Sequence, residues 1–257
     1  MDKNYTNDEN FNELIKRTKE INEMGYVKGV NNNLINSCGL TFESLLGKQS
    51  DSLFLPDFKD IEIKCKQRFS RYNIDLFTLA FDGPSLYESN YILENYGKTD
   101  EIFLDKKSLF VNLKYKEKVM VNNKYYFELD IDDKTKMLYI NIYDENDNFI
   151  EKRGFISFFS IETRINIKLR KLALVRASKR KISYDLYFRY YKISCYTLKS
   201  FETFIDMIKQ DVVKLSIVLR FSKSGAQVGK QRNKNMVFSI RQDDVEKIYD
   251  LIYNYEN

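Results

Sequence analysis

The sequence contains no histidine among its 257 residues. This absence excludes Ser-His and Cys-His nucleophile pairs and also nucleases that use a histidine base. It removes the usual zinc sites as well, and three scattered cysteines are too few for an all-thiolate zinc centre. Acid–base or metal chemistry must therefore come from carboxylates and lysines. Such ligands suit Mg²⁺, a hard cation that prefers oxygen.

Cysteines and long apolar segments are also scarce. Cys38, Cys65 and Cys195 are odd in number and widely spaced, which argues against a disulfide framework and predicts a reducing, cytoplasmic location. Apolar runs span only a handful of residues, and residues 1–30 are polar and mixed in charge, unlike a secretory signal. The length and the 43% hydrophobic content indicate one large globular domain, or one domain with two lobes.

Charge is unevenly distributed along the chain. The net charge is +5, but residues 163–234 hold 18 Lys and Arg against 4 Asp and Glu, so the remaining chain carries −9. A basic block of this kind is typical of a protein with a polyanionic partner. A charge run taken alone is more often a set of solvated strand and helix faces, and that alternative stays open at this point.

Hydrophobic periodicity and turn residues predict many short elements. Strands are expected at 61–66, 74–81, 109–116, 124–130, 137–143, 155–160, 172–176, 184–196, 213–221 and 236–240. Helices are expected at 10–24, 39–47, 89–96, 163–171, 200–209 and 243–253. The segment Lys179-Arg180-Lys181 is expected to join two strands, and residues 222–235 to form a loop.

The stretch from Leu55 to Lys64 reads Leu-Pro-Asp-Phe-Lys-Asp-Ile-Glu-Ile-Lys and contains the most informative spacing. From Ile61 onward apolar and charged residues alternate, so that Glu62 and Lys64 share one face of a strand. A turn at Phe58-Lys59 would bring Asp57 close to Glu62. Two carboxylates around one divalent cation, with an ammonium beside them, are suited to phosphodiester hydrolysis.

The spacing Asp-x₄-Glu-x-Lys alone is a weak signal in a chain rich in acids and lysines. Its other interpretation is an exposed strand face that carries an ion pair. Pro56 before Asp57, the alternation after it and the lack of histidine favour the nuclease interpretation. Glu43, on the predicted helix upstream, could complete a metal shell through a water molecule.

Two long segments carry a family resemblance. Gly39-Leu40-Thr41-Phe42-Glu43-Ser44-Leu45-Leu46, followed by the stretch from Leu55 to Lys64, resembles the MvaI/BcnI family of type II restriction endonucleases. Further matches follow in order at residues 76–78, at 96–101 and in a late Ser224-Gly225 loop. This family belongs to the PD-(D/E)xK superfamily and is related to the mismatch-repair nickase MutH.

The resemblance implies a fold, a cofactor and a site. The implied fold class is α/β (α+β): a restriction-endonuclease-like mixed sheet flanked by helices, with two lobes around a DNA cleft. Residues 1–257 would form a single endonuclease domain, with a catalytic lobe at about 1–100 and a DNA-recognition lobe at about 101–257. Asp57 and Glu62 would bind Mg²⁺, or Mn²⁺ in its place, with Glu43 in support, and Lys64 would be the catalytic lysine. A monomer and a cognate DNA methyltransferase are also implied.

The late loop departs from the family pattern, because family members place histidines where this chain has Lys230-Gln231-Arg232-Asn233-Lys234. Arginine can donate two hydrogen bonds to guanine and asparagine can bind adenine, so base recognition stays feasible. The alternative is that these side chains contact only phosphates. The residues expected to bind DNA are Arg176, Lys179, Arg180, Lys181, Arg220, Lys223, Lys230, Arg232, Asn233 and Lys234.

The sequence alone leaves three alternative functions open. The first is a site-specific, Mg²⁺-dependent restriction endonuclease acting on double-stranded DNA. The second is a MutH-like strand-nicking repair endonuclease that needs activation by a partner. The third is a DNA-binding protein without catalysis, and the intact set of Glu43, Asp57, Glu62 and Lys64 argues against it.

Overall fold

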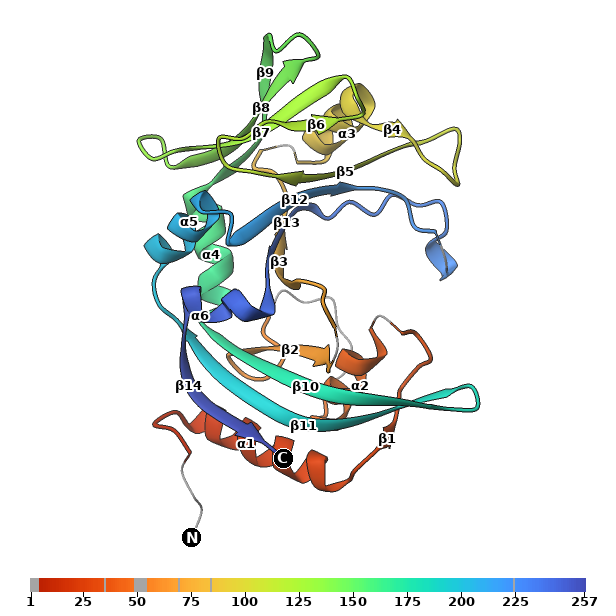
Figure 1. The fold of residues 1–257 in the computed structure, drawn as a ribbon, viewed down its shortest axis with the longest axis vertical. Helices are drawn as coiled ribbons and strands as arrows, with labels where there is room; N and C mark the ends of the chain where they lie inside the picture. Colours follow the sequence, from red (N-terminus) through yellow and green to blue (C-terminus); the bar gives the residue numbers. More distant parts are fainter. Residues whose placement is uncertain (1–4, 35, 49–54, 69, 84, 224) are drawn as a thin grey trace. The chain divides into compact units, whose positions relative to one another are not determined.

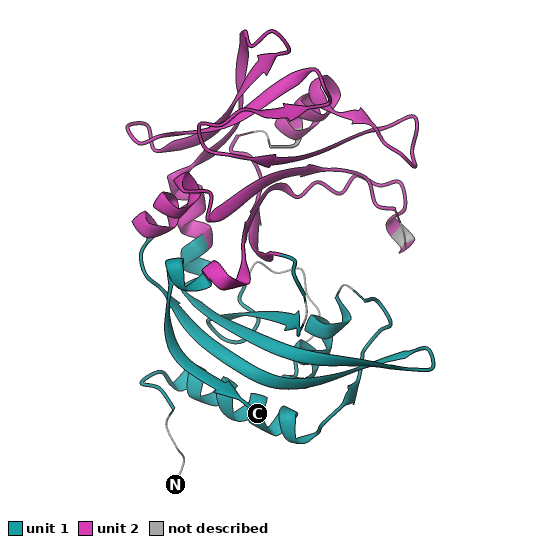
Figure 2. Ribbon diagram, in the orientation of Figure 1, with its two compact units in different colours: residues 1–72, 165–200, 245–257 teal, residues 73–164, 201–244 magenta. Residues whose placement is uncertain are grey.

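The structure is a computed structural model that describes residues 5–34, 36–48, 55–68, 70–83, 85–223 and 225–257. The chain divides into two compact units (Figure 2). Unit 1 contains residues 1–72, 165–200 and 245–257, and unit 2 contains residues 73–164 and 201–244. The units therefore interleave along the chain. Among the described residues, no helix is long and apolar enough to cross a membrane.

Unit 1 is built on a mixed five-stranded sheet (Figure 1). Its strands are β1 (Val27–Lys28), β2 (Ile61–Gln67), β10 (Lys171–Ile182), β11 (Asp185–Leu198) and β14 (Tyr249–Glu256). β2 pairs in parallel with β10, whereas β11 pairs antiparallel with β1, β10 and β14. The helices are α1 (Glu9–Glu23), α2 (Ser37–Leu45) and the short α6 (Val245–Ile248).

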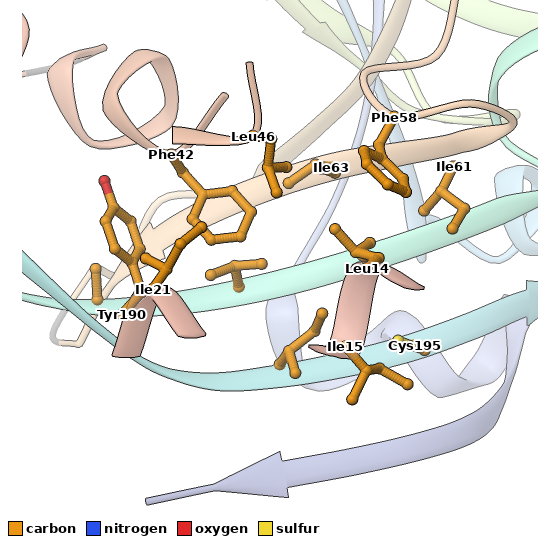
Figure 3. Packing of buried hydrophobic residues seen from close by; sticks show 14 of the residues in the cluster. Leu14, Ile15, Ile21, Phe42, Leu46, Phe58, Ile61, Ile63, Tyr190 and Cys195 are labelled. Atoms are coloured by element: carbon orange, nitrogen blue, oxygen red, sulfur yellow. The ribbon is translucent and has the colours of Figure 1, made fainter. Parts of the chain in front are cut away.

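Helix α1 and the sheet form the hydrophobic core of unit 1 (Figure 3). The carboxylate of Asp8 caps the helix by accepting a hydrogen bond from the backbone N–H of Phe11 at 3.0 Å. Phe11, Leu14 and Ile15 lie at the helical spacing i, i+3 and i+4. They pack in one buried cluster with Ile61 and Ile63 of β2. The backbone of β2 is thereby fixed from its apolar side.

Unit 2 contains two antiparallel sheets (Figure 1). One has the order β3-β13-β12-β5-β4 and the other β6-β7-β8-β9. The strands are β3 (Ile74–Leu79), β4 (Lys98–Thr99), β5 (Lys107–Leu113), β6 (Val119–Val121), β7 (Tyr125–Asp132), β8 (Met137–Asp144), β9 (Phe149–Ser157), β12 (Val213–Leu219) and β13 (Asn235–Ile240). Helices α3 (Ser85–Tyr96) and α5 (Phe201–Lys209) belong to this unit, and α4 (Phe158–Lys168) runs from unit 2 into unit 1.

The mixed α/β class is confirmed, but the predicted C-terminal helix over 243–253 is wrong. Helical structure ends at Ile248, and residues from Tyr249 onward form strand β14 along β11. Tyr253 and Tyr255 pack against the core of unit 1, whereas Tyr249, beyond a register shift, is buried separately and donates its hydroxyl to the carbonyl of Leu169 at 3.1 Å. The aromatic alternation and the free edge of β11 override the helical pattern of the preceding residues.

Two other predicted boundaries are also wrong. Lys179, Arg180 and Lys181 do not form a turn, because β10 continues to Ile182 and the chain reverses at Ser183, whose φ is +55°. The strand expected over 155–160 ends at Ser157. There the Ser157 hydroxyl accepts a hydrogen bond from the Ser160 N–H at 3.2 Å, and helix α4 begins earlier than predicted.

Candidate active site

A tight turn places Asp57 beside strand β2. The backbone groups of Phe58 and Ile61 exchange two hydrogen bonds of 3.0 and 2.8 Å, and Lys59 between them has a φ of +52°. Asp57 Oδ2 then accepts a hydrogen bond from the N–H of Ile63 at 3.0 Å. The turn expected from the sequence is confirmed, and it holds the Asp57 carboxylate next to the strand that carries Glu62 and Lys64.

Glu62 is a buried acid with two lysine partners. Its side chain is 1% exposed, so an exposed ion pair on an ordinary strand face does not describe it. Lys64 Nζ donates a hydrogen bond to Oε1 at 2.7 Å, and Lys168 Nζ from the end of α4 lies 3.3 Å from Oε2. Within the described chain, Oε2 accepts no hydrogen bond although it is buried.

Lys48 is the partner of Asp57. Its ammonium lies 2.8 Å from Asp57 Oδ1, and the Asp57 side chain is 12% exposed. Neither Lys48 nor Lys168 was identified from the sequence. Lys48 follows the end of one predicted helix, and Lys168 lies in another. The chain contains 42 Lys and Arg residues in all, and no local sequence pattern distinguishes these two from the others.

Glu43 lies half-buried on helix α2. The helix is tied to β11, because Phe42 packs on Tyr190 with ring centroids 4.9 Å apart and the Tyr190 hydroxyl donates to the carbonyl of Cys38 at 2.7 Å. Burial raises the pKa of Glu43, and the charges of Asp57 and Glu62 raise it further. Glu43 therefore belongs to the same electrostatic cluster as the two acids downstream.

Burial also raises the pKa of Glu62, and the nearby charge of Asp57 acts in the same direction. The ammonium groups of Lys64 and Lys168 oppose this shift by favouring the carboxylate form. All four predicted catalytic residues thus come together in unit 1. Lys48 and Lys168 bring the cluster to three carboxyl groups and three lysines.

The donor set fits a hard divalent cation. Asp57 and Glu62 offer carboxylate oxygens, and the buried Oε2 of Glu62 lacks a hydrogen bond that would compete with a metal. No three Asp, Glu or Cys side chains in the described ranges converge tightly enough to hold a metal by themselves. Mg²⁺ usually keeps several waters and takes only one or two carboxylates together with substrate phosphate, so two acids suffice.

The residues predicted to bind DNA fall into two separate groups. Lys179, Arg180 and Lys181 are exposed on the β10–β11 hairpin of unit 1, where the Arg180 guanidinium lies 4.0 Å from the Tyr26 ring centroid. Arg176 is half-buried on the same strand. The other six belong to unit 2: Arg220, Lys223, Lys230, Arg232, Asn233 and Lys234.

The segment from Arg220 to Lys234 extends the β12–β13 hairpin. The Arg232 N–H donates to the Arg220 carbonyl at 2.7 Å, and Lys106 Nζ donates to the Gly229 carbonyl at 2.6 Å. Arg220, Lys223, Lys230 and Arg232 are exposed. Lys223 lies 3.8 Å from Asp100, and Lys234 lies 3.2 Å from Asp75. Ser224, named in the predicted loop motif, lies outside the described residues.

Comparison with known proteins agrees with this arrangement. Residues 15–249 match the model of the MvaI/BcnI restriction endonuclease family. The solved structure "Restriction endonuclease MvaI-cognate DNA substrate complex" is 24% identical, with a TM-score of 0.86 over 96% of this chain and 99% of that one. MvaI in the absence of DNA is also 24% identical, with a TM-score of 0.58 over 96% and 98%. No curated protein matches the sequence. The family match spans most of the chain, and this protein belongs to the MvaI/BcnI restriction endonuclease family.

Proposed function

We propose that this protein is a type II restriction endonuclease that hydrolyses double-stranded DNA at a short specific sequence in a Mg²⁺-dependent reaction. The observation that carries the proposal is the buried Glu62 carboxylate, held beside Asp57 and hydrogen-bonded to Lys64, in a chain of a restriction endonuclease family. Burial and mutual repulsion both disfavour the charged forms of neighbouring carboxylates, and acids perturbed in this way cluster at functional sites.

Each residue of the cluster has a distinct role in this proposal. Asp57 and Glu62 would hold Mg²⁺, or Mn²⁺ in its place, and Glu43 would support the cation through a water molecule. When bound, the cation would neutralise charge on the scissile phosphate. The Lys64 ammonium, positioned by Glu62, orients the attacking water or helps to deprotonate it, and stabilises negative charge on the phosphoryl oxygens.

DNA contacts are assigned to the two basic groups. Exposed Lys179, Arg180 and Lys181 would bind phosphates, as would Arg176 on the same strand. Arg232 and Asn233 would contact base edges in the major groove. A monomeric, cytoplasmic enzyme with a cognate methyltransferase completes the proposal.

The test is incubation of the purified protein with unmethylated plasmid and Mg²⁺, followed by sequencing of the DNA ends. Discrete fragments with one shared end sequence are expected. Mainly nicked circles, or cleavage only after a partner is added, would instead favour a MutH-like nicking enzyme. Binding without any cleavage would indicate a non-catalytic DNA-binding protein.

A further inference from the structure

Lys168 makes a contact that the proposed reaction does not use. It lies at the last residue of α4, its side chain is 20% exposed, and its ammonium is 3.3 Å from Glu62 Oε2. The contact carries charge but is not a hydrogen bond, because Oε2 accepts none within the described chain. Lys64, in contrast, makes a hydrogen bond of 2.7 Å to Oε1. The two lysines therefore hold the two oxygens of Glu62 in different ways.

The geometry points to Lys168 as a positioning residue that serves as a displaceable counter-ion for Glu62. This inference rests on the proposed function, since it assigns Oε2 to the incoming divalent cation. In the metal-free protein the ammonium of Lys168 lies 3.3 Å from Oε2 of the buried carboxylate and offsets its charge. It then leaves Oε2 when the cation binds.

Lys168 and a divalent cation compete for Glu62 Oε2, because both are positively charged and the lysine side chain can move away. Mg²⁺ binds carboxylate oxygen at about 2.0–2.1 Å, too close for an ammonium to remain on the same oxygen without strong repulsion. Lysine has a long flexible stem, and the partial exposure of Lys168 gives its ammonium a route to solvent. The metal-free cluster is balanced, with Glu43, Asp57 and Glu62 against Lys48, Lys64 and Lys168. Removal of Lys168 leaves a net negative cluster that attracts a cation more strongly.

The experiment measures Mn²⁺ affinity by calorimetry on the full chain without DNA. Lys168→Met is expected to bind Mn²⁺ about tenfold more tightly, within the usual range of coupling between two sites. Its metal-free melting temperature should fall, because Glu62 loses a partner. Lys168→Gln provides a second neutral variant if the methionine variant folds poorly. Lys168→Arg keeps the positive charge and should bind Mn²⁺ no more tightly than the parent.

Lys171→Met is the matched control. Lys171 is 21% exposed and also lies between two carboxylates, those of Asp8 and Asp60, outside the catalytic cluster. Its removal should lower stability and leave Mn²⁺ affinity unchanged. Equal or weaker Mn²⁺ binding by Lys168→Met and Lys168→Gln, or much tighter binding by Lys168→Arg, would overturn the inference.

A separate variant, Glu62→Gln, tests whether the metal site itself is correctly assigned. Glu62→Gln is expected to lose Mn²⁺ binding. If Glu62→Gln binds Mn²⁺ as well as the parent does, the metal site itself is wrongly assigned, whatever the Lys168 variants show. If Glu62→Gln loses binding and the neutral Lys168 variants match the parent, only the counter-ion role is wrong.

Discussion

Glu62 is a carboxylate that burial alone would favour in its neutral form. Ammonium groups from β2 and α4 oppose this effect, although the pKa of Glu62 stays raised, and the pKa of Glu43 is raised as well. A raised acid pKa means that the folded protein binds more protons than the unfolded chain between the ordinary and the raised values. Stability then falls as pH rises through that interval, above the ordinary value of 4.5.

The pH prediction concerns the variant Glu43→Gln in the absence of metal. The parent should lose unfolding free energy relative to this variant as pH rises from about 4.5 toward neutrality. Comparison of urea denaturation for both proteins across that range measures the effect and cancels the titration of other groups. A difference in unfolding free energy that does not change with pH would contradict the shared electrostatic cluster.

Lys64 should affect the chemical step more than binding. Lys64→Met is expected to slow single-turnover cleavage by about 10²- to 10⁴-fold, the usual effect of losing a group that assists proton transfer. DNA affinity measured with Ca²⁺ should change little. Lys66→Met, two residues further along the same strand, is the control and should cleave at the parent rate. Equal rates for the two variants would remove Lys64 from catalysis.

The sequence predicts some residues of the candidate active site and misses others. Asp57, Glu62 and Lys64 lie within one strand and its preceding turn, so their spacing and family pattern indicate their proximity. Lys168 comes from a helix distant in sequence, and only the tertiary packing of α4 brings it to Glu62. The local sequence pattern around Lys168 does not distinguish it from lysines that lie on the protein surface.

The β10–β11 hairpin differs from its prediction at the residues expected to bind DNA phosphates. Lys179, Arg180 and Lys181 are not compressed into a turn. They are spaced along an extended strand that ends at the turn beyond Ile182. Because successive side chains of a strand point to opposite faces, Lys179 and Lys181 share one face at a spacing of about 6.6 Å, and Arg180 lies on the other face.

Charge removal from this hairpin should change the salt dependence of binding. Substitution of Lys179, Arg180 and Lys181 by alanine is expected to reduce the slope of log affinity against log salt by up to about 3, roughly one for each lost phosphate contact. The control carries the same charge change at exposed Lys124, Lys134 and Lys136 of unit 2. If both triple variants reduce the slope equally, the effect is one of net charge and not of the hairpin.

Strand β14 shows why element type was harder to predict at the C-terminus. Residues 245–248 form a short helix, and the strand that follows carries Asp250, Asn254 and Glu256 among its apolar residues. Its partner β11 is more than fifty residues away in the chain, so the pairing that decides its conformation is absent from any local window. Most internal strands were predicted to within a few residues, because hydrophobic alternation and turn residues define them locally.

For the whole molecule, the two compact units are built from interleaved segments of the chain. The predicted catalytic residues all lie in unit 1, whereas the predicted DNA contacts are divided between the units. The assignment of one catalytic lobe and one recognition lobe stays a prediction. The basic block at 163–234 supplies charge to both units, since it includes β10 and β11 as well as β12 and the loop after it.

The most direct test of the account is cleavage of a plasmid that carries the mapped target site, comparing the parent with Asp57→Asn and Asp60→Asn. The parent and Asp60→Asn should cut with Mg²⁺ and not with EDTA. Asp57→Asn should be slower by more than about a hundredfold, because even the loss of a group that supports a metal ligand costs 10- to 100-fold. Cleavage in EDTA, or equal rates for Asp57→Asn and Asp60→Asn, would contradict a carboxylate-bound metal as the basis of this activity.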